Sequence, residues 1–169
     1  MRIILFFFTL LSASFLLLSA CGSGTPEPTT RHAVLKLSTQ GTLATGTKIG
    51  AIDNITITLP SGVTVPTDAT GKVLSGVISP SGQTATGTVV PIIDSIFTPA
   101  TTGSQATLTI KMVVAAGFDP GEFATVTCNI TGSVPSATDF SINQATFKTK
   151  DLNGADITGL TASFTMSII

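Results

Sequence analysis

The chain has no tryptophan, no tyrosine and a single histidine, His32. Modules that bind polysaccharides commonly stack sugar rings on flat aromatic side chains that carry a polar tip, and only phenylalanine remains here for that task. A Ser-His-Asp site needs a histidine that packing holds and a carboxylate orients, whereas His32 follows a glycine- and proline-rich stretch. We therefore predict that the protein is not an enzyme and that it has no catalytic residues and no cofactor.

Charged residues are also scarce, with 8 Lys and Arg against 9 Asp and Glu among 169 residues. The chain contains no basic run, so we expect no nucleic-acid partner. Hydrolysis by paired carboxylates needs two acidic side chains that face each other across a cleft, but most of the acidic residues are scattered through predicted turns. They are Asp68, Asp94, Asp119, Glu122, Asp139, Asp151 and Asp156.

Cysteine occurs only twice, at Cys21 and Cys128. Cys128 shares one side of a predicted strand with Ala124, Val126 and Ile130, which predicts a small buried apolar side chain rather than a reactive thiol. If Cys21 is modified, no second cysteine is left to form a disulfide within the chain.

What the chain does have is an apolar N-terminus. Met1 and Arg2 form a short basic start, an apolar run extends from Ile3 to Leu18, and Leu18-Ser19-Ala20-Cys21 ends it. This is the layout of a secretory signal peptide. The run is shorter than the roughly 20 residues that span a bilayer. A plain signal peptide and an uncleaved helix remain the alternatives.

The Leu18–Cys21 segment resembles the lipobox of bacterial lipoproteins. The resemblance implies cleavage before Cys21, so that residues 1–20 are the signal peptide, and a diacylglycerol on the Cys21 sulfur. One acyl chain binds a membrane only marginally, but such cysteines usually carry two or three. The next residue is Gly22 rather than aspartate, which in Gram-negative lipoproteins favours the outer membrane. We therefore expect a lipid-anchored protein of the cell envelope, on the periplasmic or the cell-surface side.

Residues 21–31 follow as a predicted flexible tether. They begin Cys21-Gly22-Ser23-Gly24-Thr25-Pro26-Glu27-Pro28 and show no apolar periodicity, and their glycines and prolines disfavour regular structure. Residues 32–169 have a length that suits one domain. The predicted organisation is therefore a signal peptide, a tether and a single domain.

Apolar and polar residues alternate with a period of 2 through almost all of residues 32–169, which is typical of half-buried strands. Glycine and proline separate eight or nine such segments. The predicted fold is therefore all-β, a two-sheet antiparallel β-sandwich, with a closed barrel as second choice. We expect one short helical turn near 93–97, and Pro91 indicates an edge or a bulge. The predicted strands cover residues 33–38, 54–59, 63–65, 73–78, 84–93, 107–114, 122–131, 140–150 and 157–168.

The order of segments resembles the cohesin-type sandwich, a nine-strand jelly roll shared with some carbohydrate-binding modules. The matching segments are Ile49–Ile57, Ala106–Ala116, the turn Phe118–Glu122 and the hairpin Asp151–Ile157. Cohesins bind dockerin modules, so the resemblance implies a binding or assembly module with a protein partner. A polysaccharide ligand is the alternative, and a sheet face or an exposed edge strand, such as the one with Pro91, would be the binding surface.

Two further expectations concern individual side chains. Asp151, Asn153 and Asp156 carry oxygen ligands at spacings that suggest calcium, but the remaining ligands of an EF-hand loop are missing. Because Asn-Gly is a strong hairpin signal, we favour a simple turn. Among the phenylalanines, Phe140 and Phe164 are expected in the core, whereas Phe97 and Phe118 lie next to turns and are candidates for exposure.

Overall fold

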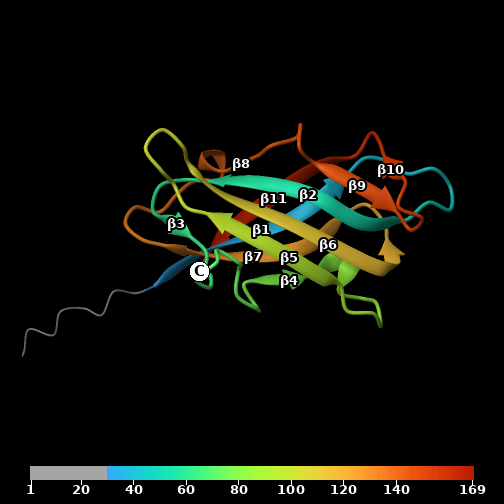
Figure 1. The fold of residues 1–169 in the computed structure, drawn as a ribbon, viewed down its shortest axis with the longest axis horizontal. Coiled ribbons are helices and arrows are strands. Elements are labelled where there is room, and N and C mark those ends of the chain that lie inside the picture. Colours follow the sequence, from blue (N-terminus) through green and yellow to red (C-terminus); the bar gives the residue numbers. More distant parts are fainter. Residues whose placement is uncertain (1–29) are drawn as a thin grey trace, which may run out of the picture.

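The computed structural model describes residues 30–169, which form two antiparallel sheets packed face to face (Figure 1). This confirms the predicted all-β sandwich, and the closed barrel is not formed because no strand pairing among residues 30–169 joins one sheet to the other. Two 3₁₀ turns, η1 (Gly82–Thr84) and η2 (Ala137–Asp139), are the helical elements of this part of the chain. The strands are β1 (Arg31–Gln40), β2 (Ile49–Leu59), β3 (Val63–Thr64), β4 (Ile78–Pro80), β5 (Ile92–Thr98), β6 (Ala106–Phe118), β7 (Glu122–Ile130), β8 (Ser141–Ile142), β9 (Lys148–Asp151), β10 (Asp156–Ile157) and β11 (Thr161–Ile168).

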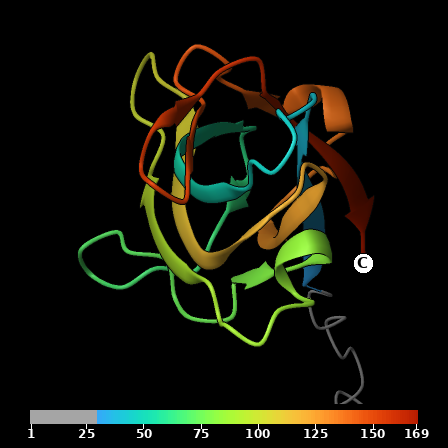
Figure 2. The same cartoon turned by 90° about the vertical axis from the view of Figure 1, so that its right-hand side faces the viewer.

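The order of strands places β5 and β11 at free ends of the two sheets. One sheet runs β11-β1-β7-β3, with β4 also paired to β7, and the other runs β10-β9-β2-β6-β5, with β8 also paired to β2. Consecutive strands such as β1 and β2, or β6 and β7, lie in different sheets, so the chain crosses between the layers several times. Figure 2 shows β11, in dark red, at one side of the sandwich.

The core lies between the sheets because alternate residues of the long strands point inward. The fully buried residues of β1 include Ala33, Leu35 and Leu37. Those of β6 include Ile110 and Met112. Successive side chains of a strand point to opposite faces, so the residues between them stay polar or partly exposed. The alternation seen in the sequence therefore predicted the correct inner face for these strands.

β2 breaks the simple alternation. Ile52 and Ile55 are both buried, although a spacing of three residues would place them on opposite faces of a regular strand. The pairing of β2 with β6 shifts register between these two residues. Such a bulge turns the second half of the strand, so both isoleucines reach the core. Within the bulge, Asn54 Nδ2 donates a hydrogen bond to the carbonyl of Thr146 at 3.2 Å.

Residues 84–93, predicted as one strand, are extended in a sheet only at their last two positions. Val89 and Val90 lie exposed in a loop, and β5 begins at Ile92. Valine and threonine favour strands by packing against a neighbouring strand, and no pairing is found for this loop in the described structure. Pro91 lies directly before β5. The edge strand that this proline indicated is therefore present, but it begins one residue after the proline.

Two neighbouring predictions were also wrong. The helical turn expected at 93–97 lies inside β5, where the side chains of Ser95 and Phe97 point inward with a period of 2. Of the strand predicted at 73–78, only the last residue belongs to a strand, β4. The loop before it turns at Gly76, whose φ of +86° is readily adopted only by glycine.

The segments 140–150 and 157–168 are each divided, which explains why there are eleven strands rather than eight or nine. Asn143 Oδ1 accepts a hydrogen bond from the Ala145 amide at 3.1 Å, and this local turn separates β8 from β9. Gly159, with φ at +83°, separates β10 from β11.

Candidate functional site

The lipidation prediction concerns the part of the chain before the described residues. Residues 1–20 and Cys21 lie outside the described region, as does most of the tether, so these predictions stay predictions. β1 begins at Arg31, one residue before the boundary at which we expected the domain to start. Among residues 30–169, no helix has the length and apolar character needed to cross a membrane.

His32 lies in β1, where its backbone exchanges hydrogen bonds of 2.9 and 3.0 Å with Ile169. Its ring Nδ1 is buried and has no hydrogen-bond partner among residues 30–169, so no carboxylate orients it there. Within the same range, no three His, Cys, Asp or Glu side chains gather closely enough to hold a metal ion. The histidine therefore lacks the arrangement that acid–base or nucleophilic catalysis requires.

The acidic side chains are spread over the surface, and four of the eight in residues 30–169 form an ion pair with a lysine. The ion pairs are Lys36–Glu122 at 3.8 Å, Lys48–Asp119 at 2.6 Å, Lys72–Asp94 at 3.3 Å and Lys150–Asp156 at 2.8 Å. Each pair joins an acidic residue to a lysine rather than to a second acidic residue. This distribution does not organise the facing carboxylates of a glycoside hydrolase.

The three calcium candidates lie in the hairpin between β9 and β10. Asp151 Oδ1 accepts hydrogen bonds from the backbone N–H groups of Asn153 and Ala155, both at 2.8 Å. Asp156 Oδ1 lies 2.8 Å from Lys150 Nζ, and this hydrogen-bonded pairing holds the pKa of the Asp156 carboxyl below its usual value. One carboxylate thus builds the turn and the other is paired with an ammonium group, which supports the turn interpretation.

We expect added calcium to leave the melting temperature unchanged. Asp151→Ala should lower the free energy of unfolding by about 1 kcal/mol because two backbone N–H groups lose their acceptor. The control, Asp156→Ala, removes only an exposed ion pair and should cost less. Thermal unfolding with calcium and with a chelator provides the measurement. A calcium-dependent rise in melting temperature that Asp151→Ala abolishes would instead establish a metal site.

Cys128 is fully buried in β7, as the sequence predicted. Burial disfavours the thiolate and raises the pKa of the Cys128 thiol to about 12. Because the thiolate is the reactive form, this side chain is not a candidate nucleophile.

Phe97 and Phe118, which their places next to turns made candidates for exposure, are both buried. Phe97 is 8% exposed and Phe118 only 2%, and the Phe118 ring packs 6.3 Å from that of Phe123. Phe140 is buried as predicted, whereas Phe164 is only half-buried beside it, with 6.1 Å between the ring centroids. No phenylalanine within residues 30–169 is fully exposed, so this region offers no aromatic platform for sugar rings.

Exposed apolar side chains gather around β5. Ten large apolar side chains are exposed in the described chain, and six of them lie on β5, on its neighbour β6 or in the two loops next to β5. We call these six the β5 surface: Leu74, Val89, Val90, Ile92, Ile96 and Val113. Soluble proteins rarely leave such side chains grouped together without a binding role.

Strand pairing fixes the arrangement of the β5 surface. Ile92, which is 72% exposed, lies directly opposite Val113 of β6. Two residues further along, Asp94 lies opposite Lys111 and forms an ion pair with Lys72 at 3.3 Å. Apolar side chains therefore alternate with a charged cluster across the outer face of two strands.

A groove of about 350 Å³ runs beside the edge of β5. Its apolar lining comes mainly from Leu74, Ile78, Val90, Pro91 and Ile93. The second half of the β5 edge is covered, because residues 71–73 form hydrogen bonds with Ser95 and Phe97. The groove therefore lies along the first half of the edge, near the start of the strand.

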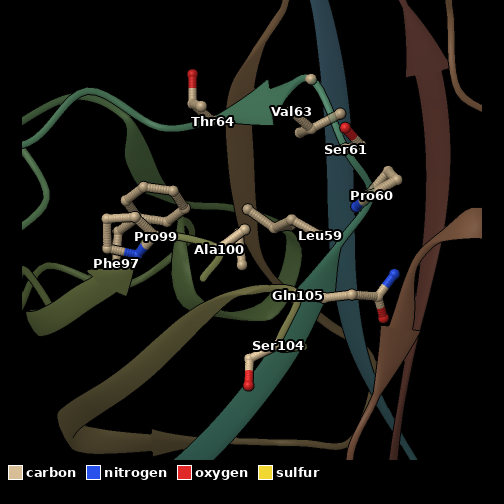
Figure 3. Close-up of a pocket in the computed structure, with 12 residues that line it drawn as sticks. Leu59, Pro60, Ser61, Val63, Thr64, Phe97, Pro99, Ala100, Ser104 and Gln105 are labelled. Atoms are coloured by element: carbon tan, nitrogen blue, oxygen red, sulfur yellow. The ribbon is translucent and has the colours of Figure 1, made fainter. Parts of the chain in front are cut away.

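A second hollow of about 360 Å³ opens where β2, β3 and the loop after β5 meet (Figure 3). Leu59, Phe97, Pro99 and Ala100 form its apolar side, and Gln105 lies at its rim (Figure 3). None of its lining residues is titratable. The hollow can receive a small apolar group, and its polar lining consists of hydroxyl, amide and backbone groups.

Comparisons with protein-family models, with curated proteins and with solved structures found no match to this chain. The function must therefore be inferred from its own surfaces. Of these, the β5 surface with its adjoining groove is the best candidate for a binding site.

Proposed function

We propose that this chain is a non-catalytic binding module, anchored at the cell envelope by a lipid on Cys21, that recognises a protein partner through the β5 surface. The observation that carries the proposal is the gathering of exposed apolar side chains around one sheet edge. The lipobox-like segment supports the envelope location, and the resemblance to cohesins supports a role in attaching or assembling proteins.

The chemistry of the β5 surface favours a protein over a polysaccharide. Protein interfaces combine an apolar centre with a polar, charged rim, and here Ile92, Ile96 and Val113 stand beside the Lys72–Asp94 ion pair. Sugar recognition would draw on exposed aromatic rings, and the β5 surface presents none. The adjoining groove could take one apolar side chain of the partner.

The test is a capture experiment with the full lipidated chain in detergent-solubilised envelope. We expect the native protein to retain one protein partner at close to stoichiometric yield. Ile92→Ser should weaken retention about tenfold, because truncating a central apolar contact costs more than 1 kcal/mol. The matched control is Val134→Ser, which changes a side chain that is 45% exposed and lies in the loop between β7 and η2. This control should bind like the native protein.

Two outcomes would contradict the proposal. The first is a native protein that retains no stoichiometric partner. The second is an equal loss of binding in the Ile92→Ser and Val134→Ser variants, which would mean that the β5 surface is not the site. Specific binding to a glycan array without a protein partner would support the polysaccharide alternative.

A further inference from the structure

β11 has an open edge. It pairs with β1 in the register that places Ala33 opposite Ile168 and Leu35 opposite Met166. One step beyond the strand, His32 and Ile169 exchange both backbone hydrogen bonds, at 2.9 and 3.0 Å. Because bonded and non-bonded pairs alternate in an antiparallel ladder, the odd-numbered residues of β11 direct their N–H and C=O groups to β1. The even-numbered residues direct theirs outward.

One end of this edge is closed by a side chain. Gln144 Nε2 donates to the carbonyl of Ala162 at 2.6 Å, and the Ala162 amide donates to Gln144 Oε1 at 3.1 Å. The side-chain amide thus takes the place that the backbone of a neighbouring strand would occupy. The next outward-facing residues, Phe164, Met166 and Ile168, have no such partner in the described structure.

The open part of the edge lacks the features that prevent edge strands of different molecules from pairing. β11 contains no charged residue and no proline, although natural proteins commonly place lysine or proline on exposed edges. Phe164 and Met166 are half-buried, and Ile168 is 38% exposed. Three unpaired backbone positions are therefore accompanied by apolar side chains that a further strand would cover.

We propose that two copies of the chain pair through β11, antiparallel across a twofold axis at Met166. Met166 then lies opposite the partner's Met166, and Phe164 lies opposite the partner's Ile168. Three opposed pairs form roughly six hydrogen bonds between the chains, two for each pair. The sheet that ends at β11 becomes continuous through both copies.

A second copy of the chain fits this edge because the three open positions are self-complementary about a twofold axis. The three residues are centred on Met166, so a twofold axis places the same three positions opposite each other. β11 is uncharged, so the axis brings no like charges together. A single strand edge is a small interface, and anchoring both copies to one membrane would raise their effective concentration.

The experiment uses the full lipidated chain in its own membrane, with Met166→Cys as the probe. Opposed Cα atoms in a hydrogen-bonded antiparallel pair are about 5.5 Å apart, which lies within the range of a disulfide. Under mild oxidation we expect most of this variant to become a disulfide-linked dimer. Cys128 is buried and has a pKa of about 12, so it does not compete. Thr86→Cys, exposed in the loop before β5, is the control and should stay monomeric.

A proline variant tests the hydrogen bonds themselves. The Ile168 N–H points away from β1, so Ile168→Pro removes a bond to the second copy and none within the chain. Adding Ile168→Pro to Met166→Cys should reduce the crosslinked fraction at least tenfold, with little change in melting temperature. Should Met166→Cys fail to fold, sedimentation of the native chain and of Ile168→Pro in detergent at high protein concentration decides between dimer and monomer.

Three results would overturn the pairing. They are an absence of dimer with Met166→Cys, an equal yield with Thr86→Cys, and a yield that Ile168→Pro leaves unchanged. A crosslink from Met166→Cys to a different protein would also overturn it, because the edge would then hold a strand of another chain. None of these results bears on the β5 surface, which is formed by two strands of the other sheet and the loops beside them.

Discussion

Replacing Cys21 with serine is expected to abolish fatty-acid incorporation into the protein completely, whereas replacing Cys128 with serine should leave it unchanged. The resemblance to a lipobox places the lipid on the Cys21 sulfur, and a serine offers no thiol for that bond. Cys128, the only other cysteine, is fully buried in β7 and cannot accept a lipid without unfolding. The measurement is metabolic labelling with a tagged fatty acid, followed by detection of the label on the purified protein.

The mass of the purified protein provides an independent check on the same prediction. A chain that begins at Cys21 and carries two or three acyl chains is expected from membranes. At about 0.8 kcal/mol per buried CH₂, such an anchor should withstand high salt and yield only to detergent. An unmodified Cys21, or an N-terminus that still carries Met1, would contradict the lipid anchor and with it the proposed location at the cell envelope.

The sequence predicted the fold class because most strands bury one face. Every second residue is apolar from Ala33 to Leu37 in β1 and from Ala106 to Val114 in β6, and the structure buries those residues. Where the chain departs from strict alternation, prediction failed for physical reasons. The bulge between Ile52 and Ile55 changes which face is buried, and residues 84–93 have strand-forming side chains but almost no partner strand. Periodicity describes one strand, whereas pairing depends on segments distant in the sequence.

The candidate site was predictable only in part. Pro91 indicated a sheet edge, and β5, which follows it, is indeed the last strand of its sheet. The sequence could not show that Ile92 and Ile96 face outward, because alternation does not say which of two apolar sets lies inside. It also gave no sign that Gln144 closes part of the β11 edge, since the two segments are 18 residues apart and meet through a side chain.

Phe123→Ala is expected to lower the free energy of unfolding by about 3–5 kcal/mol, the range for truncating a buried phenylalanine. Phe123 is completely buried at the start of β7, and its ring packs 6.3 Å from that of Phe118. Its carbonyl accepts hydrogen bonds from the Thr84 hydroxyl at 2.5 Å and from the Ser81 amide at 3.1 Å. A cavity here would therefore loosen the contact between β7 and η1 as well as the core.

Equilibrium unfolding in denaturant measures this loss. The control is Ile92→Ala, because the native side chain is 72% exposed and the substitution should change stability by no more than about 0.5 kcal/mol. Both variants reduce apolar volume, so a large difference between them isolates the effect of burial. A loss below about 1 kcal/mol for Phe123→Ala would mean that the sheets are not packed around this ring. The inner faces assigned to β6 and β7 would then be wrong.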